Sequence, residues 1–188
     1  MPAPRVVVLT APSGAGKTTI AHRVLEAMPH MSFSVSATTR PPRPDETDGE
    51  DYHFLSTEEF EAQIESGDLL EYEEVYPGRF YGTLRSEIEA KAQNGPVLLD
   101  IDVNGALNVK RAFGDNALVL FIAPPSRSEL RRRLRERGTE DSDALRARLA
   151  RADRELERAD AFDDVVVNDD LDAAVEETLT RIRQFLRE

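Results

Sequence analysis

The feature that most constrains this chain is a glycine-rich loop between a short apolar run and a helical pattern near the N-terminus. Residues 6–10 are apolar and mostly β-branched, as in a strand buried on both faces of a parallel sheet. A helical pattern follows over 18–28. Residues 11–18 fit the nucleotide P-loop pattern Gly-x4-Gly-Lys-[Ser/Thr], except that Ala11 replaces the first glycine. Backbone N–H groups in such a loop hold phosphate oxygens, so the sequence predicts a site for nucleotide phosphates.

The residues of this loop have separate expected roles. Lys17 would reach the β- and γ-phosphates, and the Thr18 hydroxyl would ligate Mg²⁺. An alanine at position 11 would cost about 1 kcal/mol only if that position needs a positive φ. GTPases, motor ATPases and small-molecule kinases all use such a loop, so the rest of the chain must distinguish them. The loop residues expected to bind ATP are Ala11, Pro12, Ser13, Gly14, Ala15, Gly16, Lys17, Thr18 and Thr19.

Charge and composition exclude several classes of function. The 188 residues carry 24 lysines and arginines against 36 aspartates and glutamates, a net charge of −12. The resulting field repels nucleic acids and anionic membranes, so neither is expected as a partner. The chain has no cysteine, which excludes disulfides and thiolate metal sites. Its N-terminal apolar run is too short for a signal peptide or a membrane span, and we expect a cytoplasmic protein.

Strand-like and helical segments alternate along most of the chain. This alternation predicts an α/β fold with a doubly wound, five-stranded parallel sheet. Ser126 and Glu129 are spaced as a capping box for one helix, and Gly138 is placed as its stop. The predicted strands are 6–10, 33–36, 97–101, 118–122 and 165–167, and the predicted helices are 18–28, 104–113, 126–137, 143–159 and 172–187.

One region, which we call the insert (38–83), breaks the alternation. It begins with the turn-rich residues 39–44 and continues with short strand-like pieces at 52–55, 69–75 and 80–83. A helix is predicted at 57–66, with Ser56 and Glu59 as a second capping box. The pattern predicts a small α+β unit rising from the main sheet.

Four segments in and beside the insert carry a resemblance to a known family. They are Ser36-x-x-Thr39-Arg40-x-x-Arg43, Gly49-x-Asp51-Tyr52, the acidic Glu71 after the insert's helix, and Tyr81-Gly82-Thr83. In this order they resemble the guanylate kinase family, over about residues 4–185. The resemblance implies a P-loop NTPase-type three-layer fold with a core (4–37, 84–125 and 159–185), a GMP-binding insert (38–83) and a helical lid (126–158).

The resemblance also implies an activity. It is the ATP-dependent, in-line transfer of a phosphoryl group to GMP and dGMP, which gives GDP and its deoxy form, with Mg²⁺ as cofactor. The implied substrates are ATP and GMP, and the chain would act as a monomer or a homodimer.

The side chains of the insert agree with a GMP site. Arg40 and Arg43 are three residues apart among prolines, so both can fork onto one phosphate. Tyr52 and Tyr81 can donate phenolic hydrogen bonds to the same phosphate. Taken alone, these four residues would fit a solvated loop with ordinary core aromatics equally well. The resemblance implies that they are the monophosphate ligands.

Glu71 is the residue that would select the base. Guanine presents two adjacent donors, N1–H and the 2-amino group, and one carboxylate accepts both, whereas adenine has no such pair. Ser36 and Thr83 can donate to guanine O6. Without the resemblance, Glu71 would be one more exposed acid in an acidic chain. The resemblance implies that Ser36, Glu71 and Thr83 read the base.

Two carboxylates follow a predicted buried strand. Asp100 and Asp102 have the period that puts both on one face, at the sheet edge where ligands bind. Asp100 fits a role in supporting Mg²⁺, directly or through water, and Asp102 would lie between the metal and GMP. The family usually has glutamine where this chain has Asn104, so Asn104 is left without a role.

The segment 126–158 is rich in arginine. It holds eleven arginines and eight acids, a net charge of +3 in a chain of −12. A positive lid would close on ATP and stabilise the charge of the transferring phosphoryl group. The resemblance implies catalytic roles for Arg133, Arg137 and Arg148 beside Lys17, Arg40 and Asp100, and an adenine contact for Asn168. We expect most other arginines of the segment to pair with acids one turn away.

Two alternatives remain open from the sequence. A catalytically silent member of this fold would bind phosphorylated peptides, but such modules typically lack the P-loop lysine that Lys17 supplies. A related P-loop kinase for a small molecule such as a ribose phosphate would have no use for Glu71, Ser36 and Thr83.

Overall fold

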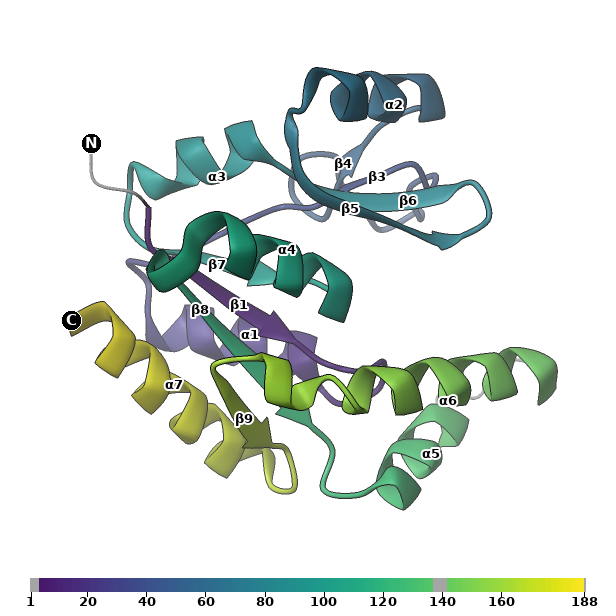
Figure 1. The fold of residues 1–188 in the computed structure, drawn as a ribbon, viewed down its shortest axis with the longest axis vertical. Helices are drawn as coiled ribbons and strands as arrows, with labels where there is room; N and C mark the ends of the chain where they lie inside the picture. The colour runs from purple at the N-terminus through teal and green to yellow at the C-terminus, as the bar shows by residue number, and fades with distance from the viewer. Residues whose placement is uncertain (1–3, 137–141, 188) are drawn as a thin grey trace.

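The protein folds as three layers around a parallel sheet (Figure 1). The computed structural model describes residues 4–136 and 142–187. The sheet has the order β2-β7-β1-β8-β9, and every neighbouring pair is parallel, which confirms the predicted five-stranded sheet. Its strands are β1 (Val6–Thr10), β2 (Ser32–Phe33), β7 (Val97–Asp100), β8 (Ala117–Ala123) and β9 (Asp164–Val167).

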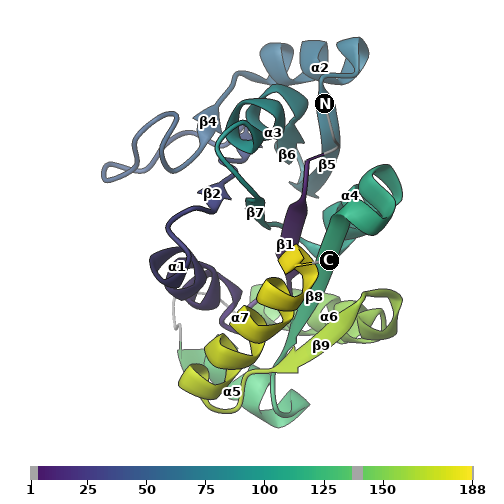
Figure 2. The same cartoon turned by 90° about the vertical axis from the view of Figure 1, so that its left-hand side faces the viewer.

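Helices cover both faces of this sheet, which explains its unbroken apolar strands. Val7 and Leu9 of β1 face α1 (Lys17–Ala27) and α7 (Leu171–Arg187). Val6 and Val8 face the other side, where α3 (Arg85–Ala92) and α4 (Val103–Phe113) pack. Figure 2 shows α1 and α4 on opposite sides of the sheet. A strand covered on both faces is typically a near-continuous apolar run without alternating polar positions.

The insert forms a second, mixed sheet of order β4-β3-β6-β5. Its strands are β3 (Ala37–Thr38), β4 (His53–Phe54), β5 (Leu69–Tyr76) and β6 (Arg79–Leu84). The helix α2 (Thr57–Ser66) covers this sheet, and its Phe60 is fully buried against Ala37 and Leu69. The predicted capping box is present, because Ser56 Oγ accepts from the Glu59 amide and the Glu59 carboxylate accepts from the Ser56 amide.

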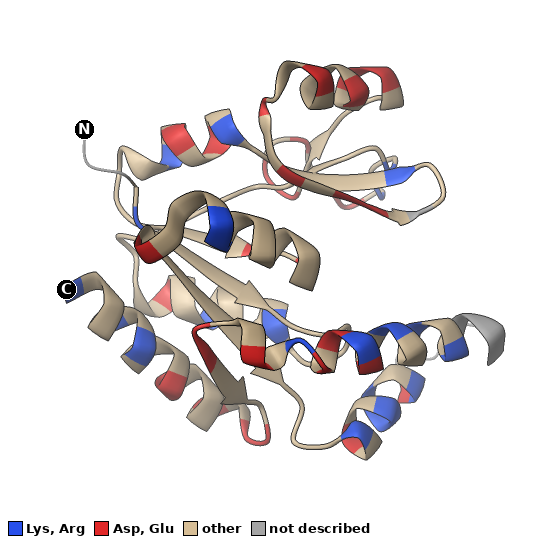
Figure 3. Cartoon of the chain, viewed as in Figure 1, with Lys and Arg blue, Asp and Glu red and all other residues tan. Residues whose placement is uncertain are grey.

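The arginine-rich segment forms two packed helices, α5 (Arg127–Glu136) and α6 (Ser142–Leu156). Leu130, Leu134 and Ala152 make a small core between them. Figure 3 shows that lysine and arginine gather on α5 and α6, whereas α2 carries acidic residues. Short 3-10 helices, η1 (Gly114–Asn116) and η2 (Ala159–Ala161), complete the described elements.

Several sequence predictions are corrected by the structure. The strand predicted at 33–36 is the two-residue β2, and the helix predicted at 143–159 ends at Leu156. The helix α3 was not predicted. Of the capping box predicted at Ser126 and Glu129 only one half forms, because the Glu129 carboxylate pairs with Arg132 and Arg133 while its amide donates to Ser126 Oγ. Gly138 lies outside the described residues.

The predicted shared strand face of Asp100 and Asp102 is wrong. The strand β7 ends at Asp100, and Asp102 is the N-cap of α4. Its Oδ1 accepts from the amides of Asn104 at 2.8 Å and Gly105 at 2.9 Å. Capping satisfies helix amides that lack an intrahelical partner, and this outweighs continuation of the strand.

Among the helices of the described residues, none has the length and apolar character needed to cross a membrane.

Replacing Ser56 by alanine should lower the free energy of unfolding by about 1 kcal/mol, because α2 loses its N-cap hydroxyl. Urea unfolding followed by circular dichroism measures the loss. Thr57→Ala, at the next and exposed position, is the matched control. Equal losses for the two variants would show that the capping box does not stabilise the insert.

Candidate active site

The P-loop occupies the turn between β1 and α1, as predicted. The helix begins at Lys17, directly after Gly16, whose φ of 94° lies in the left-handed region that favours glycine. Within the described chain no residue other than glycine has a positive φ, so Ala11 carries no backbone strain. Ala11 is buried instead, as part of the core beneath α1. The replaced first glycine therefore does not disturb the loop.

Asn168, at the end of β9, holds the loop in place. Its Nδ2 donates to the Ala15 carbonyl at 2.8 Å, and its side chain is almost wholly buried. A Cβ on Gly16 would lie 2.4 Å from the same Nδ2, so no larger residue fits there. Arg133 Nη2 donates to the Asn168 carbonyl at 3.1 Å. The structure thus gives Asn168 a supporting role, and its adenine contact stays a prediction.

Lys17, Thr18 and Asp100 meet where β1 and β7 end side by side. The Lys17 ammonium is ion-paired with the Asp100 carboxylate and donates to the Ile101 carbonyl at 2.9 Å. Thr18 Oγ1 donates to the other Asp100 oxygen at 2.7 Å. The structure thus brings together the residues expected to bind phosphate and Mg²⁺, and these binding roles stay predictions.

The oxygen ligands at this point fit Mg²⁺. Thr18 offers a hydroxyl and Asp100 a carboxylate, both hard oxygen donors that Mg²⁺ prefers. Residues 4–136 and 142–187 contain no group of three or more His, Asp or Glu side chains able to hold a metal alone. Mg²⁺ is commonly bound in this way, by one or two protein ligands together with waters and substrate phosphates.

Glu71 lies buried on the insert, on the side that faces the P-loop. Its Oε1 accepts from Thr83 Oγ1 at 2.5 Å across the β5–β6 pair, and its side chain is only 6% exposed. Its Oε2 lies so near Gly105 that a Cβ there would be 2.5 Å away, so the carboxylate needs a glycine at this turn of α4. Burial, with smaller contributions from the charges of Asp102 and Glu73, raises the pKa of Glu71 to about 7.

Arg40 is held by an internal carboxylate. Both of its terminal nitrogens donate to Glu46, each at 2.8 Å, and Glu46 also accepts from the Arg43 amide at 2.7 Å. The hydrogen bond to Arg40 is the largest cause that lowers the pKa of Glu46 to about 2. The guanidinium lies 5.2 Å from the centre of the Tyr52 ring, which is 5.9 Å from the Tyr81 ring. Arg43 is exposed.

One cleft of about 750 Å³ joins these parts. Its lining includes the whole P-loop, Asp100 and Asp102 on one side and predicted GMP residues on the other. Five predicted site residues within the described part of the chain do not line the cleft, namely Arg40, Arg43, Thr83, Arg133 and Asn168. Arg137 lies outside the described residues. The predicted site residues that line the cleft are 11–19, Ser36, Tyr52, Glu71, Tyr81, Asp100, Asp102 and Arg148.

Sequence reasoning missed several polar residues at this site. Glu46 follows Arg43 by three residues, but an acid in an exposed, acidic loop gives no signal of an ion pair. Arg151 and Glu155 also line the cleft and pair with each other at 2.8 Å. The spacing of Arg151, one turn after Arg148, could have placed it on the same face of α6.

Comparisons with known proteins agree on one family. A sequence model of the guanylate kinase family matches residues 3–185. The chain is 75% identical to a guanylate kinase of Salinibacter ruber over 99% of both chains. It is 52% identical to one of Chlorobium luteolum over 97% of this chain and 92% of that protein. The crystal structure of guanylate kinase from Anaplasma phagocytophilum superposes with a TM-score of 0.77 at 32% identity, over 96% of this chain and 85% of that one.

Replacing Glu71 by glutamine should stabilise the fold above pH 7. An unfolded glutamate ionises near pH 4.3, whereas Glu71 in the fold ionises near 7. Between these values the folded state binds a proton that the unfolded state does not, so stability falls as the pH rises through this window. We expect Glu71→Gln to gain roughly 1–3 kcal/mol at pH 8 and little at pH 4.

Urea unfolding at the two pH values measures this gain. The matched control is Glu61→Gln, which removes an exposed glutamate of α2. A Glu71→Gln variant whose stability relative to the parent does not change between pH 4 and pH 8 would contradict the buried, protonated state of Glu71.

Proposed function

The chain belongs to the guanylate kinase family and is an ATP-dependent enzyme that phosphorylates GMP to GDP, and we propose that the cleft between the P-loop and the insert is where this transfer takes place. One observation carries the assignment of the cleft. The predicted phosphate loop and the buried carboxylate of Glu71 line the same cavity from opposite sides. A cavity of about 750 Å³ is within the range of small-molecule sites.

We place ATP on the P-loop side. The loop amides and the start of α1 would hold the β- and γ-phosphates, with Lys17 as the counter-charge. Its present ion pair with Asp100 keeps Lys17 at the loop. Thr18 and Asp100 would hold Mg²⁺, which when bound neutralises charge on the phosphates. Asn168 would act on this side by holding the loop closed through Ala15.

GMP belongs on the insert side. As an anion, Glu71 would accept from guanine N1–H and the 2-amino group, while Thr83 and Ser36 act at O6. Thr83 already shares a hydrogen bond with Glu71, so the two side chains are held together before GMP arrives. Tyr52 and Tyr81 would donate to the monophosphate. Arg40 and Arg43 would supply its counter-charge, and Glu46 holds the Arg40 guanidinium beside Tyr52 in readiness.

Catalysis by this site needs positioning and charge neutralisation rather than a base. The attacking oxygen belongs to a GMP phosphate that is already ionised, so no proton has to be removed. Asp102, fixed as the cap of α4, would lie between the two substrates. The helices α5 and α6 would form the lid, from which Arg148, Arg133 and Arg137 stabilise the charge of the transferring group.

Neither alternative reading explains all of these residues. A silent binding module has no need of the Lys17–Asp100–Thr18 contacts. A kinase for a sugar phosphate would have no use for the buried Glu71 carboxylate, which is hydrogen-bonded to the Thr83 hydroxyl on the insert side of the cleft. Deoxy-GMP presents the same base and phosphate, so we propose it as a second substrate. The domain limits, the cytoplasmic location and a monomeric or homodimeric state remain predictions.

Steady-state assays with GMP, AMP, CMP and UMP test the function. We expect kcat/KM for GMP to exceed that for AMP by about 10³-fold or more, because AMP leaves the buried Glu71 unpaired. Glu71→Gln should lower kcat/KM for GMP about 10²-fold, with Glu61→Gln as the control. The parent's KM for GMP should also rise as the pH falls below 7, because protonated Glu71 cannot accept both guanine donors. Turnover of AMP at the rate of GMP, or an unimpaired Glu71→Gln variant, would refute the assignment.

A further inference from the structure

We propose that Glu73 is a positioning residue that joins the GMP-binding insert to the lid, with Asn104 and Arg151 as its partners. The proposal rests on the proposed function, since it explains how binding of GMP on the insert would place an arginine of the lid over the cleft. None of these three residues has a role in the site as derived above.

Glu73 lies on the same face of β5 as the base-reading Glu71. Glu71 is paired across the β5–β6 ladder with Thr83, and Glu73 with Tyr81, in an unbroken register. Residues two apart on a strand point to the same side. Glu71, Thr83 and Tyr81 are all proposed contacts of GMP, so Glu73 is the remaining member of this group of four.

The Glu73 carboxylate reaches away from the insert to two other parts of the protein. Its Oε1 accepts from Asn104 Nδ2 at 2.9 Å, at the start of α4. Its Oε2 accepts from Arg151 Nη2 at 3.4 Å, on α6. The side chains of Glu73 and Arg151 are 22% and 32% exposed, so the contact is partly shielded from solvent. An ion pair in such a setting is screened less than one at the surface.

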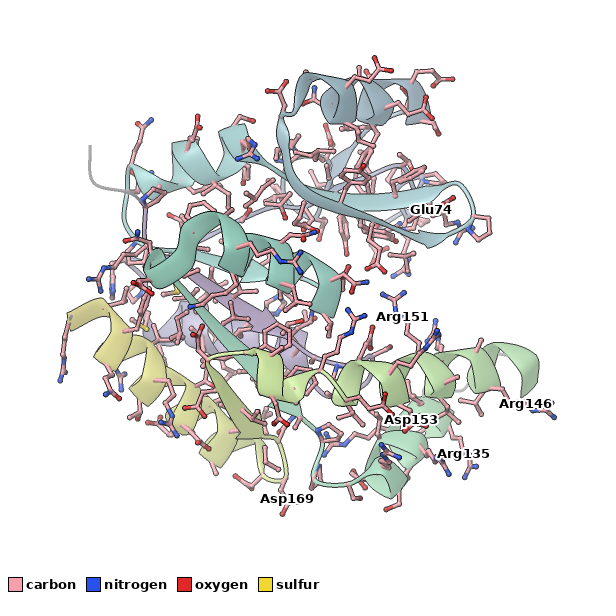
Figure 4. The ribbon with its side chains drawn as sticks, in the orientation of Figure 1. Glu74, Arg135, Arg146, Arg151, Asp153 and Asp169 are labelled. Atoms are coloured by element: carbon pink, nitrogen blue, oxygen red, sulfur yellow. The ribbon has the colours of Figure 1, made fainter. Side chains whose placement is uncertain are left out.

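Arg151 connects this contact to the catalytic part of the lid. It lies one helical turn after Arg148, and both residues line the cleft. Arg151 also pairs with Glu155 of α6 at 2.8 Å. The Arg151 guanidinium therefore contacts both Glu73 of the insert and the surface of α6. Figure 4 shows Arg151 on the side of α6 toward the insert, whereas Arg146 lies near the far end of α6. Holding Arg151 therefore also orients the face of α6 that carries Arg148.

Asn104 makes a second contact with the lid segment (126–158). While its Nδ2 donates to Glu73, its Oδ1 accepts from Arg158 Nη1 at 2.5 Å, just after α6. The backbone of Asn104 is fixed, because its amide donates to the capping carboxylate of Asp102. Asn104, which the sequence left without a role, thus connects both the insert and the lid segment to the start of α4.

Glu73 thus connects the strand that carries Glu71 with the helix that carries Arg148. Glu71 and Glu73 are two positions apart on β5, with Tyr72 between them, and Arg148 and Arg151 are one helical turn apart on α6. A movement of β5 on binding GMP must carry α6 with it or break the Glu73 contacts. The link therefore adds to closure of the lid, and only a small part of its effect should fall on the affinity for GMP itself.

A double-mutant cycle tests the link in the full-length enzyme. Glu73→Gln keeps the shape and the acceptor for Asn104 but removes the charge that Arg151 faces. We expect Glu73→Gln and Arg151→Gln each to lower kcat by about 5–10-fold with KM for GMP changed less than about threefold, and the double variant to be no worse than either single one. Asn104→Ala should also lower kcat, although it leaves the charges of Glu73 and Arg151 in place.

Two matched controls remove a charge without touching the link. Glu74→Gln changes the next residue of β5, which is exposed, and Arg154→Gln changes an exposed arginine of α6. Both should keep the parent's kcat, and circular dichroism checks that every variant is folded. Effects of Glu73→Gln and Arg151→Gln that multiply in the double variant would overturn the proposal, as would a raised KM with unchanged kcat. Absence of GMP phosphorylation by the parent would instead refute the proposed function.

Discussion

The parallel pairing of β1 with β7 is the constraint on which the active site depends. Val6 to Leu9 lie level with Val97 to Asp100, so the two strands end at the same edge of the sheet. The P-loop continues from one strand and Asp100 ends the other, which puts Lys17 and Thr18 in contact with a carboxylate more than 80 residues away. Because Val6–Leu9 and Val97–Leu99 are apolar, both strands can be covered by helices on their two faces. In the proposed mechanism, the phosphates of ATP and Mg²⁺ would be held at that edge.

The opposite side of the cleft depends on carboxylates kept away from water. Glu71 is buried beside Asp102 and Glu73, so three acids stand close together at the boundary of insert and core. Such a group is costly to ionise without donors, and burial together with the neighbouring Asp102 raises the pKa of Glu73 as well. Donors from separate elements stabilise two of these carboxylates: Thr83 donates to Glu71, and Asn104 and Arg151 donate to Glu73. The proposed specificity for guanine has the same basis, because guanine brings two donors to the buried Glu71.

Local patterns were sufficient to predict the P-loop, the sheet and the capping box of α2. In each case neighbouring residues determine the structure, through strand burial, backbone amides or a side chain three residues away. The helix α3 was not predicted because only Ile88 is buried among its eight residues, so its sequence shows little apolar periodicity. The predicted shared strand face of Asp100 and Asp102 was wrong because strand periodicity was extended past Asp100, whereas the Asp102 carboxylate accepts from two amides at the start of α4. The contacts of Asn168 with Ala15 and of Glu73 with Arg151 join residues 153 and 78 positions apart, which no local pattern reveals.

The arginines of α5 and α6 show why charge counting alone does not locate a catalytic group. Arg132 and Arg133 share Glu129, and Arg151 holds Glu155, so much of the positive charge is balanced within the helices themselves. Where such pairs are exposed, as for Arg132 with Glu136, they contribute little to stability, typically below about 1 kcal/mol. The net charge of the segment then matters less than which face of α6 the insert holds toward the cleft, and Glu73 is the residue of the insert that contacts that face.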